Sequence, residues 1–198
     1  MIFETHIPSS ELGEHIETLI YFKDFMPDHS KERVIPTGHT FIIFELDGFK
    51  RNTYDNQSLT PNNEFTEVWV SGPHKNYLTI SAHERSEMFV IQFKPYGAYP
   101  FFPTSMHQLS NSVVQANEIF GQDILDLRQQ VLAAATVAEK FALATNWLDE
   151  KFNPGKKPPE NLLKVLKVIE REKSTQNFVD LLSDYPFTRK HLINQFKK

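Results

Sequence analysis

The N-terminal half of this chain alternates short apolar runs with turn signals, and this alternation limits the fold more than any other feature of the sequence. The runs are rich in residues that favour strands, and they occupy 18–25, 40–46, 67–70, 77–82 and 88–93. The turn signals are Pro36-Thr37-Gly38, Asp47-Gly48, Asp55-Asn56, Pro61-Asn62-Asn63 and Gly72-Pro73. Such spacing predicts an antiparallel β-sandwich or β-barrel. The run 88–93 is apolar on both faces and is therefore predicted to be the most central strand.

From residue 94 onward the pattern changes from strand-like to helical. Apolar side chains at helical spacing predict helices over 119–132 and 137–152, joined as an antiparallel hairpin. Thr136 and Glu139 have the spacing of a capping box at the start of the second helix. A cluster of Asn, Pro and Gly predicts a linker, and apolar spacing after it predicts a further helix. The predicted fold class is α+β, with a β domain and helical hairpin over 1–152, a linker at 153–159 and a small all-α segment over 160–198.

The charges divide the chain into an acidic body and a basic C-terminal segment. Residues 151–198 hold eleven Lys and Arg against five Asp and Glu, whereas residues 1–150 hold ten against twenty. A basic segment on an acidic body suits nucleic-acid binding, and the negative field of the body repels phosphate. The chain has no cysteine, no signal peptide at its start and no apolar run long enough for a bilayer. We therefore expect a cytoplasmic protein without a membrane partner.

The segment 175–198 has the spacing of a helix-turn-helix. A short apolar-periodic helix is predicted to end before Pro186, because proline disfavours a helical conformation in the residue that precedes it. Thr188 can cap a second helix, on which Lys190, Asn194 and Lys197 share the face opposite the apolar side chains. Such a helix can enter a major groove and reach base edges or phosphates. A solvated helical hairpin with ordinary lysine placement is the alternative interpretation.

The order of these segments resembles the AraC-type bacterial transcription regulators, specifically members with a divergent, cupin-like N-terminal β domain. The resemblance rests on ERVIPTGHTFIIFELDG at 32–48, on QFKPYGAYPFF at 92–102, and on a set of tail residues. The tail residues are Phe178, Leu181, Phe187, Thr188, His191, Leu192, Phe196 and Lys197. This resemblance implies sequence-specific DNA binding and a β domain that senses a ligand or dimerises.

Two residues and one larger feature depart from the pattern of that group. Pro186 stands where the family usually has Gly, and Asn194 stands where Arg is common. The family's DNA-binding unit has two helix-turn-helix motifs, and this sequence contains the first. Because one motif neutralises few phosphates, we expect weak, salt-dependent binding unless a homodimer supplies a second half.

Together, spacing and resemblance predict two sets of site residues. The predicted DNA-binding residues are Thr188, Arg189, Lys190, His191, Asn194 and Lys197. Aromatic residues at alternate strand positions, Phe41 or Phe44, Trp69, and Phe89 or Phe93, could line a cavity for a small-molecule effector. Of these, Phe44, Trp69, Phe89 and Phe93 are the predicted ligand-binding residues, with ordinary core packing as the alternative.

No catalytic residue, cofactor or metal site is predicted, and the protein is not expected to be an enzyme. The histidines never occur at His-x-His spacing, and the nearest metal candidates are His83 with Glu84 and His39 with Glu45. Two other functions remain open at this point. One is a metal-dependent cupin-type enzyme, and the other is an interaction protein that does not bind DNA.

Overall fold

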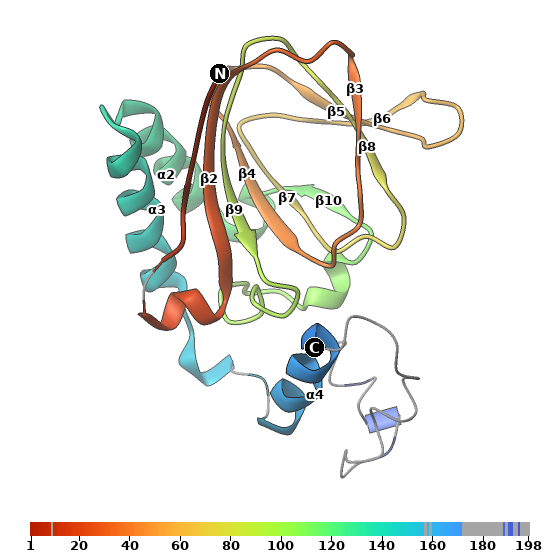
Figure 1. The fold of residues 1–198 in the computed structure, drawn as a ribbon, viewed down its shortest axis with the longest axis vertical. Coiled ribbons are helices and arrows are strands. Elements are labelled where there is room, and N and C mark those ends of the chain that lie inside the picture. The colour runs from red at the N-terminus through yellow and green to blue at the C-terminus, as the bar shows by residue number, and fades with distance from the viewer. Residues whose placement is uncertain are drawn as a thin grey trace.

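Two antiparallel sheets and a helical hairpin form three layers (Figure 1). The computed structural model describes residues 1–8, 10–156, 158, 160–171, 188, 190, 191 and 194. The six-stranded sheet has the order β1 (Ile2–His6), β2 (Ile16–Phe25), β9 (Ser86–Phe93), β4 (Thr40–Glu45), β7 (Val68–Ser71) and β10 (Val113–Gln115). The four-stranded sheet has the order β3 (Lys31–Val34), β8 (Leu78–Ser81), β5 (Arg51–Tyr54) and β6 (Pro61–Phe65). In the part of the chain that the structure describes, these are two separate sheets and not one closed barrel.

All five predicted strands are confirmed, as β2, β4, β7, β8 and β9. The central position of β9 is also confirmed, because this strand pairs with β2 on one side and β4 on the other. The turn predicted at Pro61-Asn62-Asn63 is wrong, since these residues begin β6, an edge strand that pairs with β5. Proline is tolerated at the first residue of an edge strand because no ladder hydrogen bond is lost there.

The helices are α1 (Asn117–Phe120), α2 (Gln122–Ala133), α3 (Val137–Lys151) and α4 (Glu160–Arg171), with 3₁₀ turns at Ser10–Glu14, Met106–Leu109 and Pro154–Lys156. The antiparallel hairpin of α2 and α3 and the Thr136–Glu139 capping box are confirmed. The predicted helix start at 119 is wrong, because Gly121 has φ 65° and separates α1 from α2. Lys140 donates to the carbonyl of Val131 and so closes the last turn of α2.

The main hydrophobic core lies between the six-stranded sheet and the hairpin. Along β4, Ile42 and Phe44 belong to this core, whereas Ile43 belongs to a smaller cluster with Trp69, Phe65 and Val90. Successive strand residues point to opposite faces, so the smaller cluster lies on the face that meets the second sheet. The six-stranded sheet is therefore apolar on both faces, which explains the continuous apolar runs in the sequence.

The segment after α3 is held against the β domain. The Asn153 N–H donates to the carbonyl of Pro100 over 3.0 Å, and Lys156 Nζ donates to the carbonyl of Phe102 over 2.7 Å. Helix α4 follows, as the apolar spacing predicted, and buries Leu162 and Val165. Of the predicted helix-turn-helix, all but Thr188, Lys190, His191 and Asn194 lies outside the described residues. No helix among the described residues is long and apolar enough to cross a membrane.

Candidate ligand-binding site between the sheets

A cavity of about 220 Å³ lies between the two sheets. Its lining side chains are Phe22, Phe25, Glu32, Val34, Phe41, Ile43, Arg51, Trp69, Ser71, Leu78, Ile80, Ser81, Ala82, His83, Ser86, Met88 and Val90. The apolar lining residues Phe41, Leu78 and Ile80 are only half-buried although they point between the sheets. A closed core would cover such side chains fully, so this face of the six-stranded sheet is hollow and reached by solvent.

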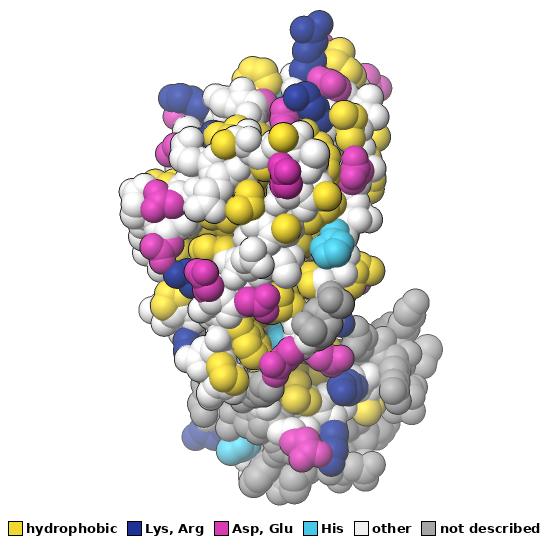
Figure 2. Space-filling model, turned by 90° about the vertical axis from the view of Figure 1, so that its left-hand side faces the viewer, with side chains coloured by type: hydrophobic (Ala, Val, Ile, Leu, Met, Phe, Trp, Pro, Cys, Tyr) yellow, Lys and Arg dark blue, Asp and Glu magenta, His cyan; other side chains and the backbone are white. Residues whose placement is uncertain are grey.

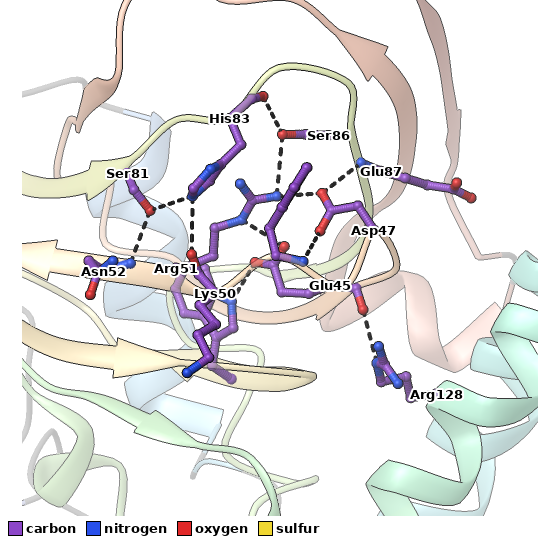
Figure 3. A network of polar contacts seen from close by, with 12 residues as sticks. Glu45, Asp47, Lys50, Arg51, Asn52, Ser81, His83, Ser86, Glu87 and Arg128 are labelled. Atoms are coloured by element: carbon purple, nitrogen blue, oxygen red, sulfur yellow. Dashed lines mark hydrogen bonds and ion pairs between the residues drawn. The ribbon is translucent and has the colours of Figure 1, made fainter.

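A cluster of buried charges borders the cavity, made of Glu45, Asp47 and Arg51 (Figure 3). Glu45 is fully buried, and its two carboxylate oxygens have different partners. Oε1 accepts from Trp69 Nε1 over 2.8 Å, and Oε2 accepts from Arg51 Nε over 2.7 Å. Since Trp69 and Arg51 both line the cavity, the carboxylate of Glu45 fixes two of its wall residues.

Asp47 is the second carboxylate on the guanidinium of Arg51. Its Oδ2 accepts from Arg51 Nη2 over 2.7 Å and from the Glu87 N–H over 3.0 Å. Arg51 Nη2 also lies 3.3 Å from Ser86 Oγ, which itself donates to the carbonyl of His83. These bonds hold Arg51 against the start of β9 as well as against β4. Two of the three guanidinium nitrogens are thereby used within the cluster.

Burial dominates the electrostatics of this cluster. It raises the pKa of Glu45 to about 7, although the charge of Arg51 and the hydrogen bonds from Trp69 and Arg51 act in the opposite direction. Burial and the charge of Arg51 lower the pKa of His83, whose Nε2 lies 3.1 Å from the carbonyl of Lys50. His83 is therefore neutral at neutral pH, and Glu45 changes its charge close to neutral pH.

Glu45 also connects the cavity to the helical hairpin. The backbone carbonyl of Glu45 accepts from Arg128 Nε over 2.9 Å, and Arg128 belongs to α2 (Figure 3). Arg128 is almost fully buried, and its Nη1 lies 3.6 Å from a carboxylate oxygen of Glu67. A shift of β4 at Glu45 would therefore act directly on a buried hydrogen bond of the hairpin.

The structure separates the four predicted cavity residues. Trp69 lines the cavity, whereas Phe44, Phe89 and Phe93 are fully buried in the core that faces the hairpin. Of the two alternatives on β4, Phe41 and not Phe44 lies in the cavity wall. Both faces of these strands are apolar, so alternation alone did not indicate which face meets the second sheet.

Sequence reasoning missed the charged cluster altogether. A signal for it exists, since Glu45 ends the apolar strand TFIIFE and occupies the same face as Ile43 and Phe41. A carboxylate at a core position needs a charged or donating partner. That partner, Arg51, lies in the other sheet, and only the folded chain brings it within reach.

The predicted metal candidates are not brought together as a cluster. His39 Nδ1 lies 2.8 Å from Thr37 Oγ1, and Glu45 has the partners described above. Among the described residues, no group of three His, Cys, Asp or Glu side chains is placed to hold a metal ion.

Four of the predicted DNA-binding residues can be described. The Oγ1 of Thr188 accepts from the His191 N–H over 3.3 Å, which is the hydrogen bond expected of an N-cap. Lys190, His191 and Asn194 are helical, and the side chains of Lys190 and Asn194 are exposed. Arg189 and Lys197 lie outside the described residues.

Comparison with known families identifies the β domain. Residues 4–115 match a family described as a domain of unknown function, DUF6597, and this match spans more than half of the sequence. The chain belongs to that family. The matched segment extends from β1 to β10, so it contains every residue of the cavity wall and of the charged cluster, and none of α2 or α3.

Two crystal structures of ToxT from Vibrio cholerae are similar to the chain. The first, of an apo variant, has a TM-score of 0.45 and 9% identity, and it covers 90% of this chain and 79% of the ToxT chain. The second has a TM-score of 0.44 and 11% identity, with 98% and 73% covered. A comparison with curated proteins gave no match.

Proposed function

We propose that the protein is a transcription regulator whose β domain senses a small molecule and whose basic C-terminal segment binds DNA. The observation that carries the sensing part is the cavity between the sheets, bordered by the cluster of Glu45, Asp47 and Arg51. The DNA-binding part rests on the tail motifs, on their resemblance to AraC-type regulators and on the charge division of the chain.

The route for a signal starts at the cavity wall. A ligand that contacts Trp69 or Arg51 disturbs the hydrogen bonds that both donate to Glu45. Glu45 is in turn bonded through its carbonyl to Arg128 of α2. The hairpin precedes the basic segment along the chain, so a change in its docking alters how that segment is presented. Such coupling requires the ligand to bind the two states of the hairpin with different affinities.

The charge distribution favours the C-terminal segment as the part that meets DNA. Asp and Glu side chains are spread over the face that carries the hairpin (Figure 2). The exposed acidic residues of α2 and α3 are Asp123, Asp126, Glu139, Asp149 and Glu150. This face repels phosphate. Lys190 and Asn194 are helical and exposed, as a helix that approaches a groove requires.

The test is fluorescence anisotropy with duplex DNA at two salt concentrations, about 50 mM and about 200 mM. We expect an affinity that falls as salt rises, and a Lys190→Gln variant whose salt slope is smaller by about one. Lys75→Gln removes an exposed lysine of the body and serves as the matched control, with unchanged binding expected. Binding without salt dependence, or an equal loss in both variants, would refute the DNA-binding part.

The proposal includes a homodimer and no catalytic step. A second copy supplies a second DNA-binding segment, and the two linked segments bind more tightly than either alone because binding of the first raises the effective concentration of the second. Sedimentation with and without duplex DNA measures this directly, with two chains per duplex expected. One chain per duplex at saturation would remove the dimer from the proposal.

A further inference from the structure

The polar end of the cavity contains a donor that the cluster leaves unused. Arg51 is 1% exposed, and its Nε and Nη2 are bonded to Glu45, Asp47 and Ser86. Its Nη1 is buried, and no described residue accepts a hydrogen bond from it (Figure 3). A buried donor without an acceptor costs free energy comparable to a lost hydrogen bond, so native structures rarely keep one without a reason.

We infer that the cavity binds a small, uncharged aromatic compound whose carbonyl-type oxygen accepts a hydrogen bond from Arg51 Nη1. This inference rests on the proposed sensing function and adds the chemical class of the ligand. An oxygen placed at the polar end satisfies the unused donor, while the rest of the molecule contacts the apolar walls.

The size and lining of the cavity favour a single aromatic ring. An engineered protein cavity of roughly 150 Å³ holds benzene, so about 220 Å³ is enough for one ring with a short substituent. Phe22, Phe25, Phe41 and Trp69 are among the lining residues, and aromatic side chains pack favourably against a ligand ring.

The charges around Arg51 favour a neutral acceptor over an anion. Two carboxylates, Glu45 and Asp47, already lie 2.7 Å from the guanidinium. Glu32 adds a third carboxylate to the cavity wall. A ligand carboxylate would therefore enter a region that already contains more negative than positive charge, in a setting that screens little. A ketone, ester or amide oxygen takes the same hydrogen bond without this repulsion.

Phe49 packs against two residues of the polar end, His83 and Arg51. Its ring stacks on His83 with centroids 5.0 Å apart and lies 5.8 Å from the guanidinium carbon of Arg51. Phe49 itself is 39% exposed.

Three probes of nearly equal size test the inference by calorimetric titration of the full chain. Acetophenone has a neutral acceptor, ethylbenzene replaces that carbonyl by a methylene, and benzoate replaces it by a carboxylate. The titrations are made at a pH about one unit above the pKa of Glu45, so that this residue is ionised. We expect acetophenone to bind about tenfold or more tightly than ethylbenzene, the effect of one hydrogen bond to a charged donor. Benzoate should bind more weakly than acetophenone.

Two variants assign the effect to the cluster. Arg51→Lys keeps the positive charge and removes the guanidinium Nη1 donor, so the ratio of the acetophenone affinity to the ethylbenzene affinity should fall to within about threefold. Glu45→Gln removes one negative charge and should strengthen benzoate relative to acetophenone. Near-ultraviolet circular dichroism checks that each variant is folded. If Arg51→Lys does not fold, the affinity ratios of the three probes for the unmodified chain and for Glu45→Gln still test the inference.

The outcomes separate the inference from the sensing function on which it rests. Equal binding of acetophenone and ethylbenzene would overturn the role of Arg51 and leave an apolar sensor cavity. Tightest binding of benzoate would overturn the neutral class and identify the site as an anion site. Binding of none of the three probes would count against the inference and the sensing function together.

Discussion

The two faces of the six-stranded sheet are packed in different ways. On the face toward the hairpin, Phe44, Phe89 and Phe93 are fully buried, and the Phe89 ring lies 5.7 Å from Phe44 and 5.8 Å from Phe141. On the opposite face, Phe41 and Met88 line a cavity and stay half-buried. The same strands therefore supply a solid core on one side and a hollow on the other. The comparison assigns stability to the first face and ligand binding to the second.

The largest expected effect compares one phenylalanine from each face. Phe89→Ala should lower the free energy of unfolding by about 3–5 kcal/mol, because it removes a ring from a close-packed core and leaves a void. Phe41→Ala should cost about 1–2 kcal/mol, because its ring is already half in contact with solvent. Denaturant unfolding measures both values. Equal losses would mean that the two faces are equally packed.

The second expected effect is a pH dependence of stability that arises from Glu45, next to the cavity. The pKa of Glu45 rises from 4.5 to about 7 on folding, so the folded protein binds more protons than the unfolded chain between these values. The contribution of Glu45 is fully present below about pH 4.5 and is lost as the pH rises through about 7, on the order of 3 kcal/mol.

The free energy of unfolding should be measured between about pH 4.5 and 7 for the unmodified chain and for Glu45→Gln. In Glu45→Gln, most of the decrease in this free energy with rising pH should be absent. The control is Glu118→Gln, which changes an exposed carboxylate of α1 and should leave the pH profile unchanged. A Glu45→Gln profile parallel to that of the unmodified chain would contradict a raised pKa at this position.

The third effect enlarges a small side chain on each face. Ala144 of α3 is fully buried against the sheet, so Ala144→Leu should cost about 1–3 kcal/mol through overpacking. Ala82 borders the cavity, so Ala82→Leu should cost less than about 1 kcal/mol because the added atoms enter free space. Thermal unfolding of the two variants measures both losses of stability. If Ala82→Leu is the more damaging change, the cavity is not open space.

The elements of the fold were largely predictable, because β2, β4, β7, β8 and β9 are rich in strand-forming residues and α2 and α3 have clear apolar stripes. Four of the missed strands lack such a pattern, and a fifth, β10, has only three residues. β1 has all five residues exposed, β3 and β6 are mostly polar, and β5 contains a buried arginine. Such strands are specified by their pairing partners, which the local sequence does not reveal.

The site was less predictable than the fold, for a different physical reason. Assigning Phe41 and not Phe44 to the cavity requires knowing which face of β4 meets the second sheet, and both faces are apolar. The pairing of Glu45 with Arg51 joins strands of different sheets, so no periodicity within one strand contains it. Trp69 lines the cavity, and its apolar ring and its N–H suit a site with one polar partner.

The most direct test of the difference between the two faces uses the two tryptophans of the chain. Trp69 lines the cavity, whereas Trp147 lies in the hairpin core with its ring 5.2 Å from Phe120. Each indole N–H gives one signal in a proton–nitrogen correlation spectrum, and Trp147→Phe assigns them. On titration with acetophenone, the Trp69 signal should shift saturably while the Trp147 signal stays in place. A shift of Trp147 equal to that of Trp69, or no shift of either, would contradict a hollow, ligand-binding face opposite a solid core.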